Sequence, residues 1–241
     1  MNKLIGIDGC KFGWIAVSTS DSFGQLFKTL NELVSFYDDQ TIFLVDMPIG
    51  LSSEKVERTC DRDARKELSP KRRSSIFPIP CRKAIYAENY ELANRINRDV
   101  LQKGLSKQSW FICSKIRELD HLLLQDENLR LRLKESHPEL AFHHLNQGIS
   151  MEFNKKTEEG QKERLSTLLK FSQNISDIHR KTVQKFTRTD VAKDDILDAL
   201  CLAVTLEEMI KNNISLESSQ FDEKGLGMKI NVFSTLDIDL R

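Results

Sequence analysis

Short apolar runs separated by turn residues open the chain. Residues 3–8 (KLIGID) and 13–19 (GWIAVST) are rich in β-branched and aromatic side chains and flank a glycine-containing turn. This pattern predicts a two-stranded hairpin. A third strand is expected in GQLFKTL, at 24–30.

A helix and a buried strand are expected next. Apolar positions from Leu30 to Tyr37 are spaced as one helical face, and Asn31 stands where an N-cap is expected. The run TIFLVDMPIGL (41–51) shows no alternation of polar and apolar residues. Such a run is typical of a strand covered on both faces.

The remaining pattern is mainly helical. Residues 52–82 are basic and proline-containing, which indicates an exposed, partly irregular segment, and 84–133 carry helical periodicity. HPELAF (137–142) resembles one more strand, and 157–186 again favour helices. KDDILDALCLAVTLEEMI (193–210) predicts a long amphipathic helix, whose alanines 199 and 203 permit close approach to a sheet.

These elements together predict an α/β fold with a mixed sheet flanked by helices. We expect a single domain over residues 1–241, with a basic loop and a helical insertion at about 52–133, between the later strands.

Composition narrows the classes of function. The 36 basic residues balance the 36 acidic residues, so no global field attracts nucleic acid or a membrane surface, and any polyanion site must be local. Five scattered cysteines without a C-x-x-C pair argue against a disulfide framework and a zinc ribbon. No apolar stretch reaches membrane-spanning length, so we expect a cytoplasmic protein without a membrane partner.

Acidic residues stand out at the ends of the apolar runs. Asp8 ends the first run and Asp46 ends the buried strand, and carboxylates at the ends of adjacent strands lie about 5 Å apart. The last helix begins with Asp194, Asp195 and Asp198. Asp194 is four residues and Asp195 three residues before Asp198, so either of them can share a helix face with Asp198. Because bare carboxylates repel, this arrangement predicts a Mg²⁺ or Mn²⁺ site.

Each acid also has a structural explanation. Asp46 can shape the turn before a proline, and Asp194 or Asp195 can cap the helix. Asp198 lies one turn inside the helix, beyond the positions where capping helps.

Several motifs together resemble the DUF429 family of predicted ribonuclease H-like nucleases, and the last helix is closest to that of RuvC-like resolvases. The motifs are GIDGCKFGWIAV, LVDMPIGL, RTCDRDARKEL, SSIFPIPCR, GLSKQSW with KIRELD, ESHPELAF, KKTEEGQKERL and DDILDAL. The resemblance implies a ribonuclease H-like nuclease that cleaves phosphodiester bonds with two metal ions held by Asp8, Asp46, Asp195 and Asp198. Asp195 is preferred over Asp194 because its spacing to Asp198 matches the resolvases.

The same resemblance adds residues around the acids. Glu139 is expected as a further ligand or catalytic residue and His137 as a proton carrier. RuvC-like resolvases act as dimers, so a homodimer is an open expectation. The second acid of those enzymes is a glutamate, whereas Asp46 is one methylene shorter.

Basic and polar residues are the candidates for binding a nucleic acid or a nucleotide phosphate. An arginine array in RTCDRDAR is expected on one side of a helix, although Asp61 within it equally suggests a solvated salt-bridged face. The substrate-binding candidates are Arg58, Arg62, Arg65, Arg82, Ser106, Gln108 and His137.

Two other functions remain open. A phosphotransferase of the actin-like and sugar-kinase type also begins with an Asp-Gly loop, but the later half of this chain is poor in glycine. A non-catalytic protein that binds nucleotide or nucleic acid on the same fold is the third alternative.

Overall fold

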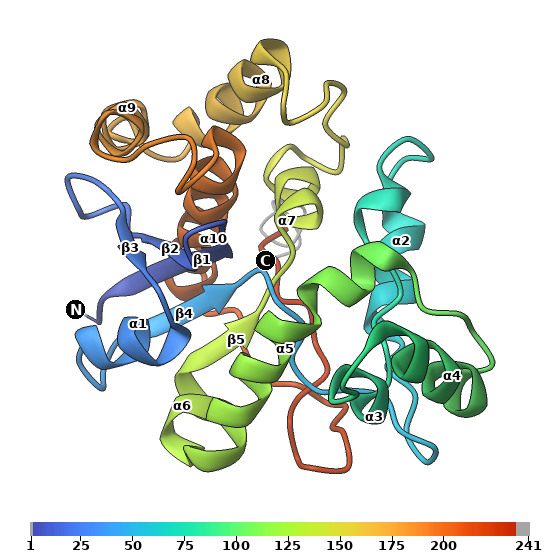
Figure 1. Ribbon diagram of the computed structural model, residues 1–241. Coiled ribbons are helices and arrows are strands. Elements are labelled where there is room, and N and C mark those ends of the chain that lie inside the picture. The colour runs from blue at the N-terminus through green and yellow to red at the C-terminus, as the bar shows by residue number, and fades with distance from the viewer. Residues whose placement is uncertain (1, 235–241) are drawn as a thin grey trace. The chain divides into compact units, whose positions relative to one another are not determined.

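The computed structural model describes residues 2–234, which form two compact units (Figure 1). The described part of the first unit comprises residues 2–46, 132–216 and 231–234. The second comprises Met47–Leu131 and Glu217–Ile230. Each unit is therefore assembled from segments that are distant in the sequence.

A five-stranded mixed sheet forms the centre of the first unit. Its order is β3-β2-β1-β4-β5, in which β1 pairs antiparallel with β2 and parallel with β4, and β4 pairs parallel with β5. The strands are β1 (Leu4–Gly9), β2 (Trp14–Val17), β3 (Gln25–Phe27), β4 (Ile42–Val45) and β5 (Leu133–Glu135). The predicted hairpin, third strand and buried strand are thus all present, and the fold is mixed α/β.

The helix predicted after the third strand is α1 (Leu30–Phe36), but its cap is not Asn31. The Thr29 side chain accepts a hydrogen bond from the Glu32 backbone N–H, as an N-cap residue does. Asn31 already lies inside the helix. The prediction chose Asn31 because Thr29 and Asn31, two positions apart, both have side chains suited to capping.

The prediction of a strand at 137–142 is wrong. Residues 138–142 of HPELAF lie in α7 (Pro138–Leu145). The strand of this region is β5, which has three residues and begins at the last residue of the stretch expected to be helical. Pro138 occupies the first turn of α7, where its fixed φ suits a helix and its missing N–H is not needed. A three-residue strand is too short to show periodicity.

The long helix α10 (Lys193–Lys211) covers one face of the sheet, as its small residues predicted. It contacts β1, β2 and β4, and α7, α8 (Glu158–Leu169) and α9 (Ile175–Lys185) pack against it. Leu44 belongs to the cluster on this face, whereas its strand neighbour Phe43 packs against Tyr37 at the end of α1. Successive strand residues point to opposite faces, so α1 and α10 lie on opposite sides of the sheet (Figure 1).

Gly6 determines how closely α10 approaches the sheet. A Cβ atom at this position would overlap the backbone of α10 at Ala199 and Ala203. The glycine in β1 and the two alanines therefore form one close-packed contact, next to the strand end that carries Asp8.

Helices make up most of the second unit. Around Arg82, the guanidinium donates to the carboxylates of Asp120 and Asp222, and Asp222 also accepts the backbone N–H of Leu51 and of Leu226. This network joins four separate parts of the unit. Its helices are α2 (Cys60–Glu67), a 3₁₀ helix η1 (Arg73–Ser75), α3 (Arg82–Ile85), α4 (Tyr90–Leu101) and α5 (Lys107–Gln125), and α6 (Glu127–Arg132) leads to β5.

Replacing Gly6 with alanine should destabilise the protein by about 2 kcal/mol or more, because α10 has to move away from β1. Chemical denaturation followed by circular dichroism measures the effect. Gly104→Ala is the matched control, since the nearest atom to its Cβ is a side-chain nitrogen at 3.5 Å. Equal stability of Gly6→Ala and the wild type would contradict the close contact.

Candidate functional site

Asp8 and Asp46 lie side by side at the carboxyl ends of two parallel strands. The Asp46 N–H donates to the Ile7 carbonyl at 2.9 Å, which continues the β1–β4 ladder by one residue. Asp8 is on the same face of β1 as Gly6, and Asp46 is on the same face of its strand as Leu44. Both carboxylates therefore point to the side of the sheet that α10 covers, as predicted from the strand ends.

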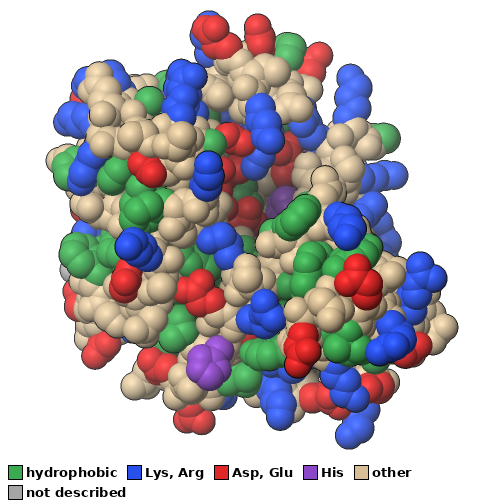
Figure 2. Space-filling model, viewed as in Figure 1, with side chains coloured by type: hydrophobic (Ala, Val, Ile, Leu, Met, Phe, Trp, Pro, Cys, Tyr) green, Lys and Arg blue, Asp and Glu red, His purple; other side chains and the backbone are tan. Residues whose placement is uncertain are grey.

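The first turns of α10 bring three more carboxylates to this face. Asp198 and Asp194 are buried, with 2% and 7% exposure, and Asp195 is partly buried. Asp195 also accepts the Ala192 backbone N–H at 3.1 Å, so it caps the helix. The capping explanation holds for Asp195, while Asp198 has no capping role. Acidic side chains gather in the upper middle of the face shown in Figure 2.

Burial and neighbouring carboxylates disfavour the ionised forms of Asp8, Asp46 and Asp195. Burial, with Asp46 and Asp198 nearby, raises the pKa of Asp8 well above its usual value. Burial likewise raises the pKa of Asp46, against the influence of His137. The pKa of Asp195 is raised to about 6, mainly by burial and also by Asp194. Such shifts are typical of functional sites in which acids share a small volume.

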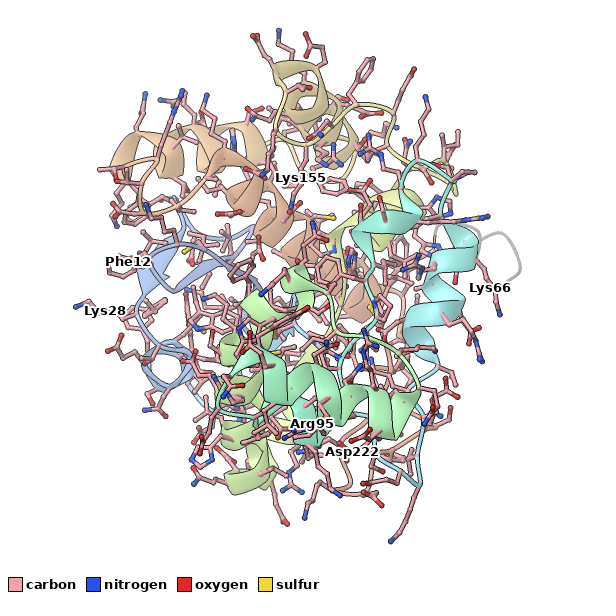
Figure 3. The ribbon with its side chains drawn as sticks, turned by 45° about the vertical axis from the view of Figure 1, so that its right-hand side comes forward. Phe12, Lys28, Lys66, Arg95, Lys155 and Asp222 are labelled. Atoms are coloured by element: carbon pink, nitrogen blue, oxygen red, sulfur yellow. The ribbon has the colours of Figure 1, made fainter. Side chains whose placement is uncertain are left out.

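Lys155 is the residue that sequence reasoning missed. Its Nζ lies 2.6 Å from Asp198 Oδ2 and 3.9 Å from Asp194 Oδ2. Burial lowers the pKa of Lys155, but Asp198 and Asp8 outweigh this effect and leave it raised, so the lysine is charged. Figure 3 labels Lys155 beside α10. One fixed cation therefore offsets part of the acidic charge.

Hydrogen bonds hold the loop that carries Lys155. The Glu163 carboxylate accepts the backbone N–H groups of Glu152 and Phe153, and Arg164 Nη1 donates to the Phe153 carbonyl at 3.1 Å. A Cβ on Gly160 would overlap the carbonyl of Asn154. The start of α8 thus fixes the backbone on the N-terminal side of Lys155, whereas Lys156 is exposed. The motif KKTEEGQKERL begins at Lys155 and includes most of α8, and that was the signal in the sequence.

Glu139 is near this loop but is committed to an ion pair. Its Oε2 accepts from Arg164 Nη2 at 2.8 Å, and the Arg164 side chain is fully buried. The pair ties α7 to α8. His137 occupies the position immediately before α7 and is close enough to Asp46 to influence its pKa.

The other candidates for substrate binding lie in the second unit. Arg58 is buried, bonded to both oxygens of Asp61 and to the carbonyls of Ile49 and Gly50. It precedes α2, so Arg58, Arg62 and Arg65 do not share one helix. Arg82 holds the network with Asp120 and Asp222, Ser106 caps α5, and Gln108 is exposed on that helix.

The acids of the first unit fit a hard divalent cation in donor type and in excess charge. Burial and neighbouring carboxylates raise the pKa of Asp8, Asp46 and Asp195, and carboxylate oxygen is the ligand that Mg²⁺ and Mn²⁺ prefer. Among residues 2–234, however, no three His, Cys, Asp or Glu side chains already surround one point at metal-binding distances. Lys155 instead contacts Asp198, so a cation that bound there would have to displace the ammonium group.

We expect Lys155→Met to lower the free energy of unfolding by about 1–3 kcal/mol at pH 7.5 without metal, because buried Asp198 loses its partner. Mn²⁺ should then raise the melting temperature of the variant more than that of the wild type. Lys156→Met, which removes an exposed charge next in the chain, is the control. If Mn²⁺ raised the melting temperature of all three proteins equally, Lys155 and the metal ion would not compete for the same carboxylate.

Stability without metal should fall as pH rises through about 6. Because the pKa of Asp195 is raised, the folded state holds its proton more tightly than the unfolded state does. This proton therefore adds to the free energy of unfolding below pH 4, and the contribution is lost above pH 6. Thermal unfolding in EDTA from pH 4.5 to 8 measures this. Asp195→Asn should flatten the profile, while Asp63→Asn, whose exposed carboxylate has a lowered pKa, should not. If stability depended on pH in the same way in Asp195→Asn and in the wild type, Asp195 would not be the group responsible for the loss of stability.

No helix within residues 2–234 is both long enough and apolar enough to cross a membrane.

Comparison with known proteins places the chain in a family without a described activity. No curated protein and no solved structure was found to match it. Residues 6–215 match the family model described as "Protein of unknown function (DUF429)". This match spans most of the 241 residues and every residue of the acidic site. The chain is therefore a member of the DUF429 family.

Proposed function

We propose that the protein is a divalent-metal-dependent nuclease with a ribonuclease H-like fold. The observation that carries the proposal is the meeting of Asp8 and Asp46, at the ends of adjacent parallel strands, with Asp198 of the helix that covers them. Strand, hairpin, buried strand and late helix occur in the order on which the resemblance rests, and Asp8, Asp46 and Asp198 lie on the same side of the sheet. This agreement supports the fold assignment as well.

Asp8, Asp46, Asp198 and either Asp195 or Asp194 would hold the Mg²⁺ or Mn²⁺ ions. A bound cation at this position would polarise a phosphodiester and make water a better nucleophile at neutral pH. Asp195 is partly engaged as a helix cap, while Asp194 lies 3.9 Å from Lys155 Nζ, so both stay candidates. Glu139 keeps α7 and α8 in place through Arg164 and acts as a positioning residue.

Lys155 and His137 complete the proposed machinery. Once released from Asp198, the Lys155 ammonium group can pair with a phosphate oxygen, since its loop stays fixed by Glu163 and Arg164. His137 lies near Asp46 and has a side chain suited to proton transfer near neutral pH. The substrate is a nucleic acid or a nucleotide phosphate.

The test is hydrolysis of a labelled panel of single strands, duplexes, RNA–DNA hybrids, branched junctions and nucleotides with Mn²⁺. Asp8→Asn should reduce cleavage by at least about a hundredfold, because a direct ligand matters more than its supporting residues, whose loss costs 10–100-fold. Asp177→Asn is the matched control, an exposed carboxylate paired with Arg180.

Cleavage that Asp8→Asn retains would come from a contaminant or from another site and would refute the proposal. Absence of cleavage by folded wild type across the whole panel, with Mn²⁺ binding demonstrated calorimetrically, would do the same.

A further inference from the structure

A pocket of about 800 Å³ lies within the second unit. It is bounded by residues 52–58, by α2 and η1, and by the C-terminal end of α4 with the residues that follow it. Its volume is in the range of sites that accept small molecules or cofactors.

Positive charge dominates the lining. Seven basic residues face three acidic ones: Lys55, Arg58, Arg62, Arg65, Lys66, Arg73 and Lys103 against Glu54, Glu57 and Asp61. Arg58 and Asp61 neutralise each other, and Glu54 pairs with Lys83 outside the pocket. Figure 2 shows Lys and Arg side chains along the edge where Figure 1 places α2 and α4.

Two arginines of the pocket are held by carbonyl groups. Arg65 Nη1 donates to the Ile76 carbonyl at 2.6 Å, and Arg73 Nε donates to the Leu68 carbonyl at 3.0 Å. Within residues 2–234 neither forms an ion pair with a carboxylate. A carbonyl fixes a guanidinium without neutralising it, and each group keeps further N–H donors for an anion.

Apolar residues supply the rest of the wall. Val56, Pro78, Ile79, Val100 and Leu101 line the same pocket. A site that combines fixed, uncompensated guanidinium groups with an apolar wall suits a ligand that has phosphate at one end and a planar or apolar body at the other. The exposed Arg62 can also stack on a planar ring.

The geometry points to this pocket as a binding site for a nucleoside phosphate, with Arg65 and Arg73 on the phosphate groups and the apolar wall against the base. This inference is independent of the proposed hydrolysis, because it uses no residue of the acidic site and needs no metal. A free nucleotide and the phosphorylated end of a strand present the same chemistry.

Calorimetric titration of the full chain in EDTA tests the site, under conditions that stop metal-dependent cleavage. ATP should bind, adenosine should bind at least about tenfold more weakly, and added NaCl should weaken ATP binding. Binding of ATP without cleavage of any substrate would leave this inference standing while the proposed function fails. No binding of ATP, or equal binding of adenosine, would overturn it.

Variants locate the binding. The double variant Arg65→Gln, Arg73→Gln should lose at least about tenfold in ATP affinity, because two charge-assisted contacts are removed. In Arg73→Gln the amide nitrogen stands where Nε was and can still donate to the Leu68 carbonyl, whereas Arg65→Gln loses the bond from Nη1 to Ile76, so circular dichroism checks the fold. Arg95→Gln, which removes the charge of an exposed arginine of α4 outside the pocket (Figure 3), is the control. An unchanged affinity of the double variant, or an equal loss in Arg95→Gln, would overturn the inference.

Oligonucleotides with and without a 5′-phosphate distinguish the two sources of the ligand. Tighter binding of the phosphorylated strand than of ATP assigns the pocket to strand ends, and the reverse order assigns it to free nucleotides. Either order supports a nucleoside phosphate site, whereas equal binding of the two oligonucleotides together with undetectable ATP binding would refute it.

Discussion

Repulsion among buried carboxylates is the constraint around which the first unit is built. Asp8, Asp46 and Asp198 meet where two strands end beneath a helix, and burial together with neighbouring carboxylates raises the pKa of Asp8 and of Asp46. An ammonium group relieves part of this repulsion, because Lys155 lies within ion-pair distance of both Asp194 and Asp198. Much of α8 serves to hold that lysine, through Glu163, Arg164 and the close contact at Gly160. The charge balance of the site is therefore encoded in three separate parts of the chain.

Close packing holds these charged residues in fixed positions. Helix α10 touches β1 at Gly6 through the backbone of Ala199 and Ala203, and Asp198 immediately precedes Ala199 in the same buried stretch of the helix. Because interiors are packed as densely as organic crystals, a small shift of the helix would change every distance between the acids. The fully buried Arg164–Glu139 pair acts similarly between α7 and α8. Packing and charge thus constrain the same few residues.

Sequence reasoning succeeded where the local pattern carried the information. The strand ends at Asp8 and Asp46 and the helix around Asp198 were predicted because apolar runs and helical spacing mark them directly. It failed for β5 and α7, since three residues are too few to show a period and Pro138 was not recognised as a helix start. The motif KKTEEGQKERL contains Lys155, but the contact of this lysine with Asp198 depends on a loop held by tertiary contacts and could not be predicted from the pattern. Similarly, the commitment of Arg58 to Asp61 and two carbonyls is visible only in three dimensions.

The network around Asp222 has a consequence for the order in which the chain can fold during synthesis. Asp222 accepts the Leu51 backbone N–H and an Arg82 guanidinium, both of which belong to a segment that ends at Leu131. The ribosome reaches Glu217 only 86 residues later, since 217 − 131 = 86. At about 5–20 residues per second, the second unit waits roughly 4–17 s for its missing piece. During that interval the Arg82 guanidinium lacks one of its two carboxylates, so the network of the second unit closes only after Asp222 has been synthesised.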